Sequence, residues 1–163
     1  MKFLKVFLTF IIIAIIASCS DKTPTAPEKT YSICYIKTLD ILSMPMTDNV
    51  GGGWDLGSGA DVYFIIVNPY GQKLTGSGTN RYDDVTTSKF PLSFVFPAPY
   101  FKLPALEEKT TIQLWDYDSG SDDDFIGSVD FLALNYTTGA NKYPLSVTVA
   151  FGSTNVTLGL KWE

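Results

Sequence analysis

From Tyr31 to its end, the chain is a series of short runs in which apolar and polar residues alternate, separated by Gly, Pro, Asn and Asp. A period of two places every second side chain on the same face, as in a half-buried β-strand. The alternation is clearest at Thr111–Trp115 and Asn155–Leu160, and no stretch here has a convincing helical period. We therefore expect strands at Tyr31–Leu42, Asp61–Asn68, Lys73–Gly78, Phe90–Phe96, Thr110–Tyr117, Ile126–Leu134, Tyr143–Phe151 and Asn155–Trp162.

Eight strands of this kind are typical of an all-β, antiparallel Greek-key sandwich. Several prolines interrupt the middle of the chain, and a proline inside a helix would break it. A chain of 163 residues accommodates one domain once a targeting segment is removed. The sequence therefore predicts one β-sandwich over residues 31–163, with one main site.

Residues 1–18 are typical of a bacterial export signal, with Lys2 and Lys5 before an apolar run over residues 6–16. That run is too short to span a bilayer comfortably. It ends in Ile16-Ala17-Ser18-Cys19, which resembles a lipobox, the site where bacteria attach diacylglycerol to cysteine. An uncleaved signal anchor and a plain secretory peptide are the alternatives. We expect a lipoprotein signal peptide over 1–18 and lipidation of Cys19.

Residues 19–30 are rich in Ser, Thr, Pro and Lys without an apolar period, so they are expected to be a flexible tether. Attached acyl chains would hold the domain at a membrane. Ser20, rather than Asp, follows Cys19, which resembles lipoproteins sorted to the outer membrane. The expected location is the bacterial envelope. Cys34 has no disulfide partner in this scheme and is expected to be a small buried residue.

The net charge is −5, and removal of Lys2 and Lys5 leaves about −7. An acidic domain without a basic cluster argues against nucleic acid and against constitutive binding of anionic lipid. The basic residues Lys73, Arg81, Lys89 and Lys102 look scattered. The chain has no histidine, Cys34 has no partner base, and no serine has a nucleophile-elbow context, so we expect no enzyme activity.

Two loops are strongly acidic. The first, Thr47–Asp61, carries Asp48, Asp55 and Asp61 among several glycines, and the second, Asp116–Asp124, is mostly aspartate, glycine and serine. Two carboxylates about 4 Å apart repel by roughly 4 kcal/mol at an effective dielectric constant near 20. Calcium would offset this repulsion, because it binds about six to eight oxygens from Asp side chains, carbonyls and water. Solvated turns of Asp, Gly and Ser are the simpler alternative.

The helix–loop–helix calcium motif does not fit the second loop. Counted from Asp116, its fifth, sixth and twelfth positions would be Gly120, Ser121 and Gly127, where that motif needs an acid or Asn, a Gly and a Glu. The flanking segments are also predicted to be strands. A calcium site here would therefore be of another kind.

Two spacings resemble the C2 domain family. Thr111-Ile112-Gln113-Leu114-Trp115-Asp116-Tyr117-Asp118, followed by Asp124-Phe125-Ile126-Gly127, resembles the family's strand that ends in Asp-x-Asp and is followed six residues later by a third Asp. Asp55-Leu56-Gly57-Ser58-Gly59-Ala60-Asp61-Val62-Tyr63 resembles its other half, two aspartates separated by five residues before a Tyr-containing strand. The resemblance runs from about Tyr31 to the C-terminus and implies a circular variant whose extra strand lies at the C-terminal end.

The resemblance implies two or three bound calcium ions. The side-chain ligands would be Asp55, Asp61, Asp116, Asp118 and Asp124, with main-chain oxygens from Trp54 and Tyr117. Asp48 is an alternative first ligand, since the loop before Asp55 is longer than in many relatives. Val62 replaces the usual proline after the second aspartate.

Trp54 could anchor a membrane or a partner, or could cover the end of the core. Tyr100 and Phe101 could form an aromatic platform or plug the sandwich. The leading prediction is a non-enzymatic calcium-binding C2-like module that is anchored to the membrane through its N-terminal lipid and contacts a phospholipid head group or an envelope protein. The alternative is a structural or adhesin-type accessory lipoprotein in which calcium is structural or absent.

Overall fold

A computed structural model describes residues 28–48, 50–55 and 58–163. The predicted signal peptide, Cys19 and the tether up to residue 27 lie outside the described residues. Within these ranges the regular structure consists of ten β-strands and two short 3-10 helices. Over the same part of the chain, no helix is long and apolar enough to cross a membrane.

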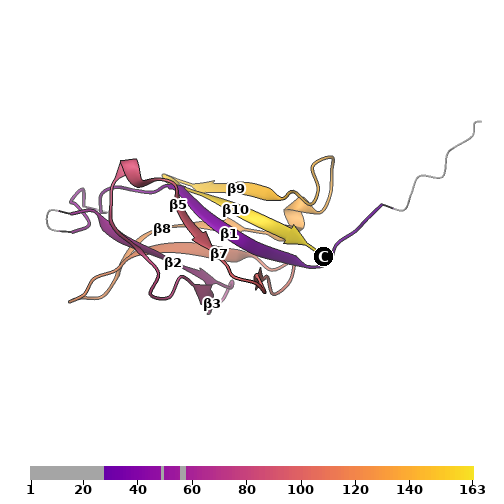
Figure 1. Cartoon of the computed structure of the whole chain (residues 1–163), viewed down its shortest axis with the longest axis horizontal. Coiled ribbons are helices and arrows are strands. Elements are labelled where there is room, and N and C mark those ends of the chain that lie inside the picture. The colour runs from indigo at the N-terminus through magenta and orange to yellow at the C-terminus, as the bar shows by residue number, and fades with distance from the viewer. Residues whose placement is uncertain (1–27, 49, 56–57) are drawn as a thin grey trace, which may run out of the picture.

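The strands form two antiparallel sheets, which Figure 1 shows as two layers. One sheet has the order β5 (Leu92–Val95), β1 (Cys34–Ser43), β10 (Thr154–Trp162), β9 (Ser146–Phe151), and β6 (Phe101–Lys102) also pairs with β1. The other has the order β3 (Lys73–Gly76), β2 (Ala60–Val67), β7 (Thr110–Asp116), β8 (Asp124–Phe131), and β4 (Tyr82–Val85) also pairs with β2. The chain crosses repeatedly between the layers, so the predicted all-β, antiparallel sandwich is confirmed.

The core lies between the two sheets and follows from the alternation in the sequence. In β2, β7 and β10 nearly every second residue is buried. Phe64 of β2 packs edge-on against Phe94 of β5, with ring centroids 4.9 Å apart across the two layers. Burying a side chain of this kind stabilises the fold by roughly 1.5–3 kcal/mol. The repeated pattern therefore sets both the strands and the face that each turns inward.

All eight expected strands are present, most of them shorter at one or both ends. The expected strand Tyr143–Phe151 begins only at Ser146, and the run Ile126–Leu134 ends at Phe131, after which Ala133–Tyr136 forms a 3-10 helix. The structure adds two short strands that were not predicted, β4 and β6. β4 carries two aspartates, one of them, Asp84, with a φ of 51°, and β6 has only two residues, so neither shows a clear alternation.

The two ends of the sandwich differ in which segments they carry. At one end, Cys34 of β1 lies opposite Trp162 of β10, next to the C-terminus marked in Figure 1. At the other end, β7 leads into β8 through the second acidic loop, and β2 begins at Ala60 after the first. The fold thus brings the two acidic loops to the end opposite the C-terminus.

Cys34 is 1% exposed, as predicted for a small core residue. Burial raises the pKa of its thiol to about 12, so the thiol stays protonated and unreactive at neutral pH.

Candidate metal site

Asp116 is the central carboxylate of the acidic end. It is the last residue of β7, lies opposite Val62 of β2, and is 0% exposed. Its Oδ1 accepts a hydrogen bond of 2.6 Å from the backbone N–H of Asp61. Its Oδ2 is buried and has no hydrogen-bond partner. A buried carboxylate oxygen without a partner costs free energy, and an ion bound to it would remove that cost.

Burial is the main cause that raises the pKa of Asp116 to about 6. The hydrogen bond from the Asp61 N–H lowers this pKa, and the nearby carboxylates of Asp55, Asp118 and Asp61 raise it. Three of the predicted ligands therefore lie close enough to Asp116 to act on its charge. They come from both acidic loops, which are far apart in the sequence. The predicted convergence of the loops is thus found at Asp116.

Asp61 is held by groups that were not predicted to belong to the site. Its Oδ1 accepts a 2.9 Å hydrogen bond from the backbone N–H of Asp84, and the Nε of Arg81 lies 3.6 Å from its Oδ2. The Arg81 guanidinium also lies over the Tyr117 ring, 4.1 Å from the ring centroid. Arg81 therefore places a positive charge beside the acidic cluster and touches both loops.

The second acidic loop is held in shape by Asp123. Its Oδ1 accepts a 3.1 Å hydrogen bond from the backbone N–H of Asp118, and its Oδ2 accepts a 2.6 Å hydrogen bond from the Tyr63 hydroxyl. Because both carboxylate oxygens have partners, Asp123 has a structural role. It ties the loop to β2 and fixes the backbone beside Asp118.

Asp124 begins β8 and lies opposite Asp116 across the β7–β8 ladder. Directly opposite residues in an antiparallel pair point to the same face of the sheet. Asp124 is exposed, and it lines a surface hollow together with Asp48, Val50, Trp54 and Phe125. It therefore lies at the rim of the acidic end, with the first loop on its other side.

The Asp48 carboxylate accepts hydrogen bonds from the backbone of its own loop. Its Oδ1 accepts hydrogen bonds from the backbone N–H groups of Val50, at 2.9 Å, and Gly52, at 2.6 Å. Trp54 is half-buried against the core, and its Nε1 donates to the Pro45 carbonyl at 3.1 Å. These contacts favour Trp54 as a cover for the end of the core. They do not involve the main-chain oxygens of Trp54 and Tyr117, which stay predicted ligands.

The described side chains do not form a compact ligand cage. Among residues 28–48, 50–55 and 58–163, no set of three or more His, Cys, Asp or Glu residues has an arrangement that could hold a metal ion directly. The donor chemistry nevertheless suits a hard cation, because the gathered groups are carboxylates and one buried oxygen lacks a partner. Asp55, Asp61, Asp116 and Asp118 stay the predicted calcium ligands, and Asp124 lies at the rim beside them.

Sequence reasoning missed three residues that organise this end: Arg81, Asp123 and Tyr63. Asp123 lies inside the acidic run of the sequence. Nothing in the sequence shows that its carboxylate accepts a hydrogen bond from β2, whereas neighbouring aspartates are predicted ligands. Arg81 lies in a connection between strands, twenty residues after Asp61, with no spacing that links the two.

No family model matches the chain, and no curated protein matches it. Among solved structures, the chain is similar to human GIVD cytosolic phospholipase A2 in complex with methyl gamma-linolenyl fluorophosphonate inhibitor and terbium chloride. The two are 18% identical with a TM-score of 0.51, over 83% of this chain and 18% of the phospholipase. The phospholipase without a named ligand gives a TM-score of 0.50 at 18% identity, over 83% and 17% of the two chains.

A third similar structure is a C2 domain of plant extended synaptotagmin 1, at 13% identity and a TM-score of 0.48, over 83% of this chain and 97% of that domain. The chain spans less than a fifth of the phospholipase, and the likeness is one of fold.

Proposed function

We propose that this protein is a non-enzymatic calcium-binding module, anchored to the bacterial envelope through a lipid on Cys19. The observation that carries the calcium part is Asp116, a fully buried carboxylate with one unpartnered oxygen among three other aspartates. Calcium supplies positive charge and oxygen coordination at such a site. The protein's own contribution is to hold the carboxylates together at the ends of rigid strands.

The partner would meet the acidic end. Without an ion, the loops present concentrated negative charge and repel anionic groups. Two bound divalent ions would nearly neutralise the five predicted ligand carboxylates and would leave coordination positions for an anionic ligand. A phospholipid head group or an acidic patch on an envelope protein would then complete the coordination, and nucleic acid is not an expected partner of this acidic domain.

The first test is a calcium titration followed by thermal unfolding of the purified protein after treatment with a chelator. We expect calcium to raise the melting temperature saturably, because it binds the folded site only. Terbium, which also prefers oxygen ligands, gives an independent readout through emission excited by nearby Trp and Tyr rings such as Tyr117.

Asp118→Asn is expected to abolish most of the calcium response, since it removes one ligand charge beside Asp116. Asp122→Asn is the matched control, because it changes the same charge in the same loop at an exposed residue that is not a predicted ligand. An equal loss in both variants, or an unchanged response in Asp118→Asn, would contradict the assignment.

A structural accessory role is the second candidate, and Arg81 favours it. Its guanidinium already lies beside Asp61 and could balance part of the acidic charge without a metal ion. Under this alternative Arg81→Gln destabilises the chelated protein, and calcium leaves the melting temperature of both proteins unchanged. Under the first proposal, Arg81→Gln instead retains a clear stabilisation by calcium.

A further inference from the structure

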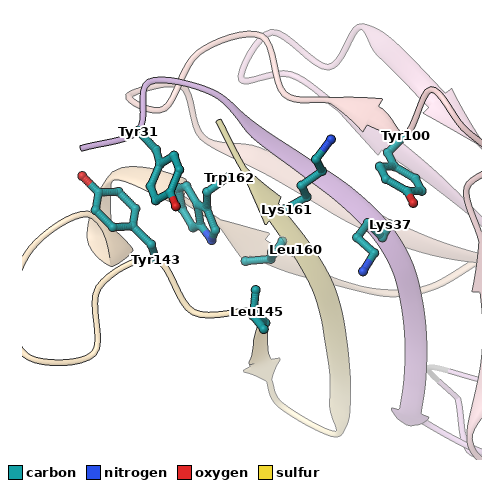
Figure 2. A pocket seen from close by; sticks show the side chains of 8 residues that line it. All are labelled: Tyr31, Lys37, Tyr100, Tyr143, Leu145, Leu160, Lys161 and Trp162. Atoms are coloured by element: carbon teal, nitrogen blue, oxygen red, sulfur yellow. The ribbon is translucent and has the colours of Figure 1, made fainter. Parts of the chain in front are cut away.

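A second charged surface lies at the opposite end of the sandwich from the acidic loops. A hollow of about 280 Å³ there is lined by Tyr31, Lys37, Tyr100, Tyr143, Leu145, Leu160, Lys161 and Trp162, which Figure 2 shows. These residues come from β1, from β10 and from the segments directly before β1, β6 and β9. None of them belongs to the proposed metal site or to the sheet that carries it.

The aromatic wall of this hollow is a packed cluster. The Tyr31 and Tyr143 rings meet edge-on with centroids 4.9 Å apart, and Tyr143 meets Trp162 at 5.3 Å. The Trp162 Nε1 donates to the Pro144 carbonyl at 2.7 Å, so its polar atom is satisfied and its ring is held in place. Leu145 is 79% exposed at the rim. The hollow thus has a rigid aromatic side with an exposed apolar edge.

The other side of the hollow is basic. The ammonium groups of Lys37 and Lys161 lie 5.9 Å and 5.8 Å from the centre of the Tyr100 ring. Lys161 is paired with Glu163. Lys37 forms no ion pair with any carboxylate in the part of the chain that the structure describes. Lys37 is therefore a cation at the hollow whose charge is not balanced locally.

More lysines surround the hollow than line it. Lys29 lies over the Tyr31 ring and Lys142, which is paired with Glu28, lies near the Tyr143 ring, with ammonium-to-centroid distances of 4.7 Å and 5.8 Å. Lys102 lies opposite Tyr35 in the β1–β6 pair. Together with Lys37 and Lys161, they are more than half of the Lys and Arg residues that the structure describes. Five lysines that are far apart in the sequence are in this way gathered at one end of an acidic domain.

The chain outside the structure enters the domain at this same end. Tyr31, which lines the hollow, comes directly after the predicted tether, and the apolar run of residues 6–16 precedes it. A lipid on Cys19 would therefore hold this end, with its lysines and tyrosines, next to the bilayer. Tyr and Trp are enriched at membrane–water interfaces, and each lysine near an anionic surface contributes about 1 kcal/mol of binding.

We propose that this lysine and aromatic hollow binds the phosphate group of an anionic membrane lipid, without calcium, and turns the acidic loops away from the anchoring bilayer, so that of their two proposed partners they meet the envelope protein. The orientation rests on the proposed anchoring, whereas the binding itself rests on the charge and shape of the hollow. Lysine is well suited to a phosphate as a point charge, and the exposed Leu145 edge suits the boundary of the acyl chains.

The test is vesicle sedimentation of the predicted mature chain, residues 19–163, carrying Cys19→Ser, in chelator, so that neither the export signal, the lipid anchor nor the acidic loops can contribute. We expect binding to vesicles of phosphatidylglycerol and phosphatidylcholine, none to phosphatidylcholine alone, and weaker binding as salt rises. Lys37→Gln with Lys161→Gln should weaken binding by about 30-fold. Lys73→Gln with Lys89→Gln, which removes the same charge elsewhere, should leave it within about twofold.

Equal loss in the two double variants, a requirement for calcium, or no vesicle binding would overturn the proposal. Binding of a soluble acidic oligosaccharide or acidic peptide in place of vesicles would also overturn it, since the occupant would then be another class of ligand. The calcium response of the melting temperature is measured on the same variants and should stay intact. A failure of the hollow is thereby distinguished from a failure of the metal site.

Discussion

Burial and neighbouring carboxylates make the ionised form of Asp116 unfavourable in the folded protein. Its pKa is raised to about 6 from the usual 3.8, so between these values the folded state binds more protons than the unfolded state. Stability contributed by this proton is present at acid pH and is lost as the pH rises through about 6. The lowered pKa values of Asp130 and Glu163 act in the opposite direction, at lower pH.

We predict that, in chelator, Asp116 makes the protein less stable at about pH 7 than at about pH 4, by about 2 kcal/mol. The measurement is the free energy of unfolding at both pH values for the protein and for Asp116→Asn. Taking the difference between the two proteins cancels the contributions of the other carboxylates. Saturating calcium at neutral pH should remove most of this loss, and a difference that does not change with pH would contradict the burial argument.

At the scale of single elements, the approach of β4 to the start of β2 depends on Gly59. A Cβ at Gly59 would lie 2.1 Å from the carbonyl oxygen of Val85, and backbone cannot move aside as a flexible side chain can. This glycine comes two residues before Asp61, whose carboxylate accepts the Asp84 N–H of β4. The short strand β4 thus helps to set the position of a predicted ligand.

Gly59→Ala is therefore expected to lower the free energy of unfolding by about 1–3 kcal/mol and to weaken calcium binding. Gly120→Ala is the control in the other acidic loop, because nothing lies within 4 Å of its added Cβ. Denaturant unfolding and the terbium titration measure the two effects. Similar behaviour of both variants would show that the contact with Val85 has no special importance.

The strands were predictable where alternation is long, as in β2, β7 and β10, because burial of every second residue determines both the element and its inner face. The short strands were not, since two or four residues carry too little pattern. The residues of the candidate site also fall into a predictable and an unpredictable group. The resemblance to the C2 family singled out Asp55, Asp61, Asp116, Asp118 and Asp124, which stay predicted ligands. In contrast, Arg81, Asp123 and Tyr63 act through side-chain contacts between segments that no local spacing reveals.

Charge is separated along the length of the sandwich. A group of five lysines forms only when β1, β6 and β10 pair side by side: Lys29, Lys37, Lys102, Lys142 and Lys161. Of the four basic residues that were expected to be scattered, only Lys102 belongs to this group. Composition gives the negative net charge of the domain but not where the charged residues lie. The domain therefore offers two chemically opposite ends, joined by one continuous core.

The one core shared by both sheets predicts a single cooperative unfolding transition. Leu158 of β10 is 0% exposed, and Leu158→Ala should lower the free energy of unfolding by about 2–5 kcal/mol. Leu145→Ala, at a side chain that is 79% exposed, should change it by less than about 0.5 kcal/mol. Denaturant curves followed by near- and far-ultraviolet circular dichroism should coincide, and two separate transitions would contradict a shared core.

The position of β10 has a consequence for how the protein matures. This strand lies between β1 and β9, and it pairs along the whole of β1, more than a hundred residues earlier in the chain. One layer of the sandwich therefore stays open until residues 154–162 have left the ribosome and can return to residues 34–43. Contacts this distant form slowly, which keeps the newly made polypeptide unfolded for longer and would suit the proposed export across a membrane.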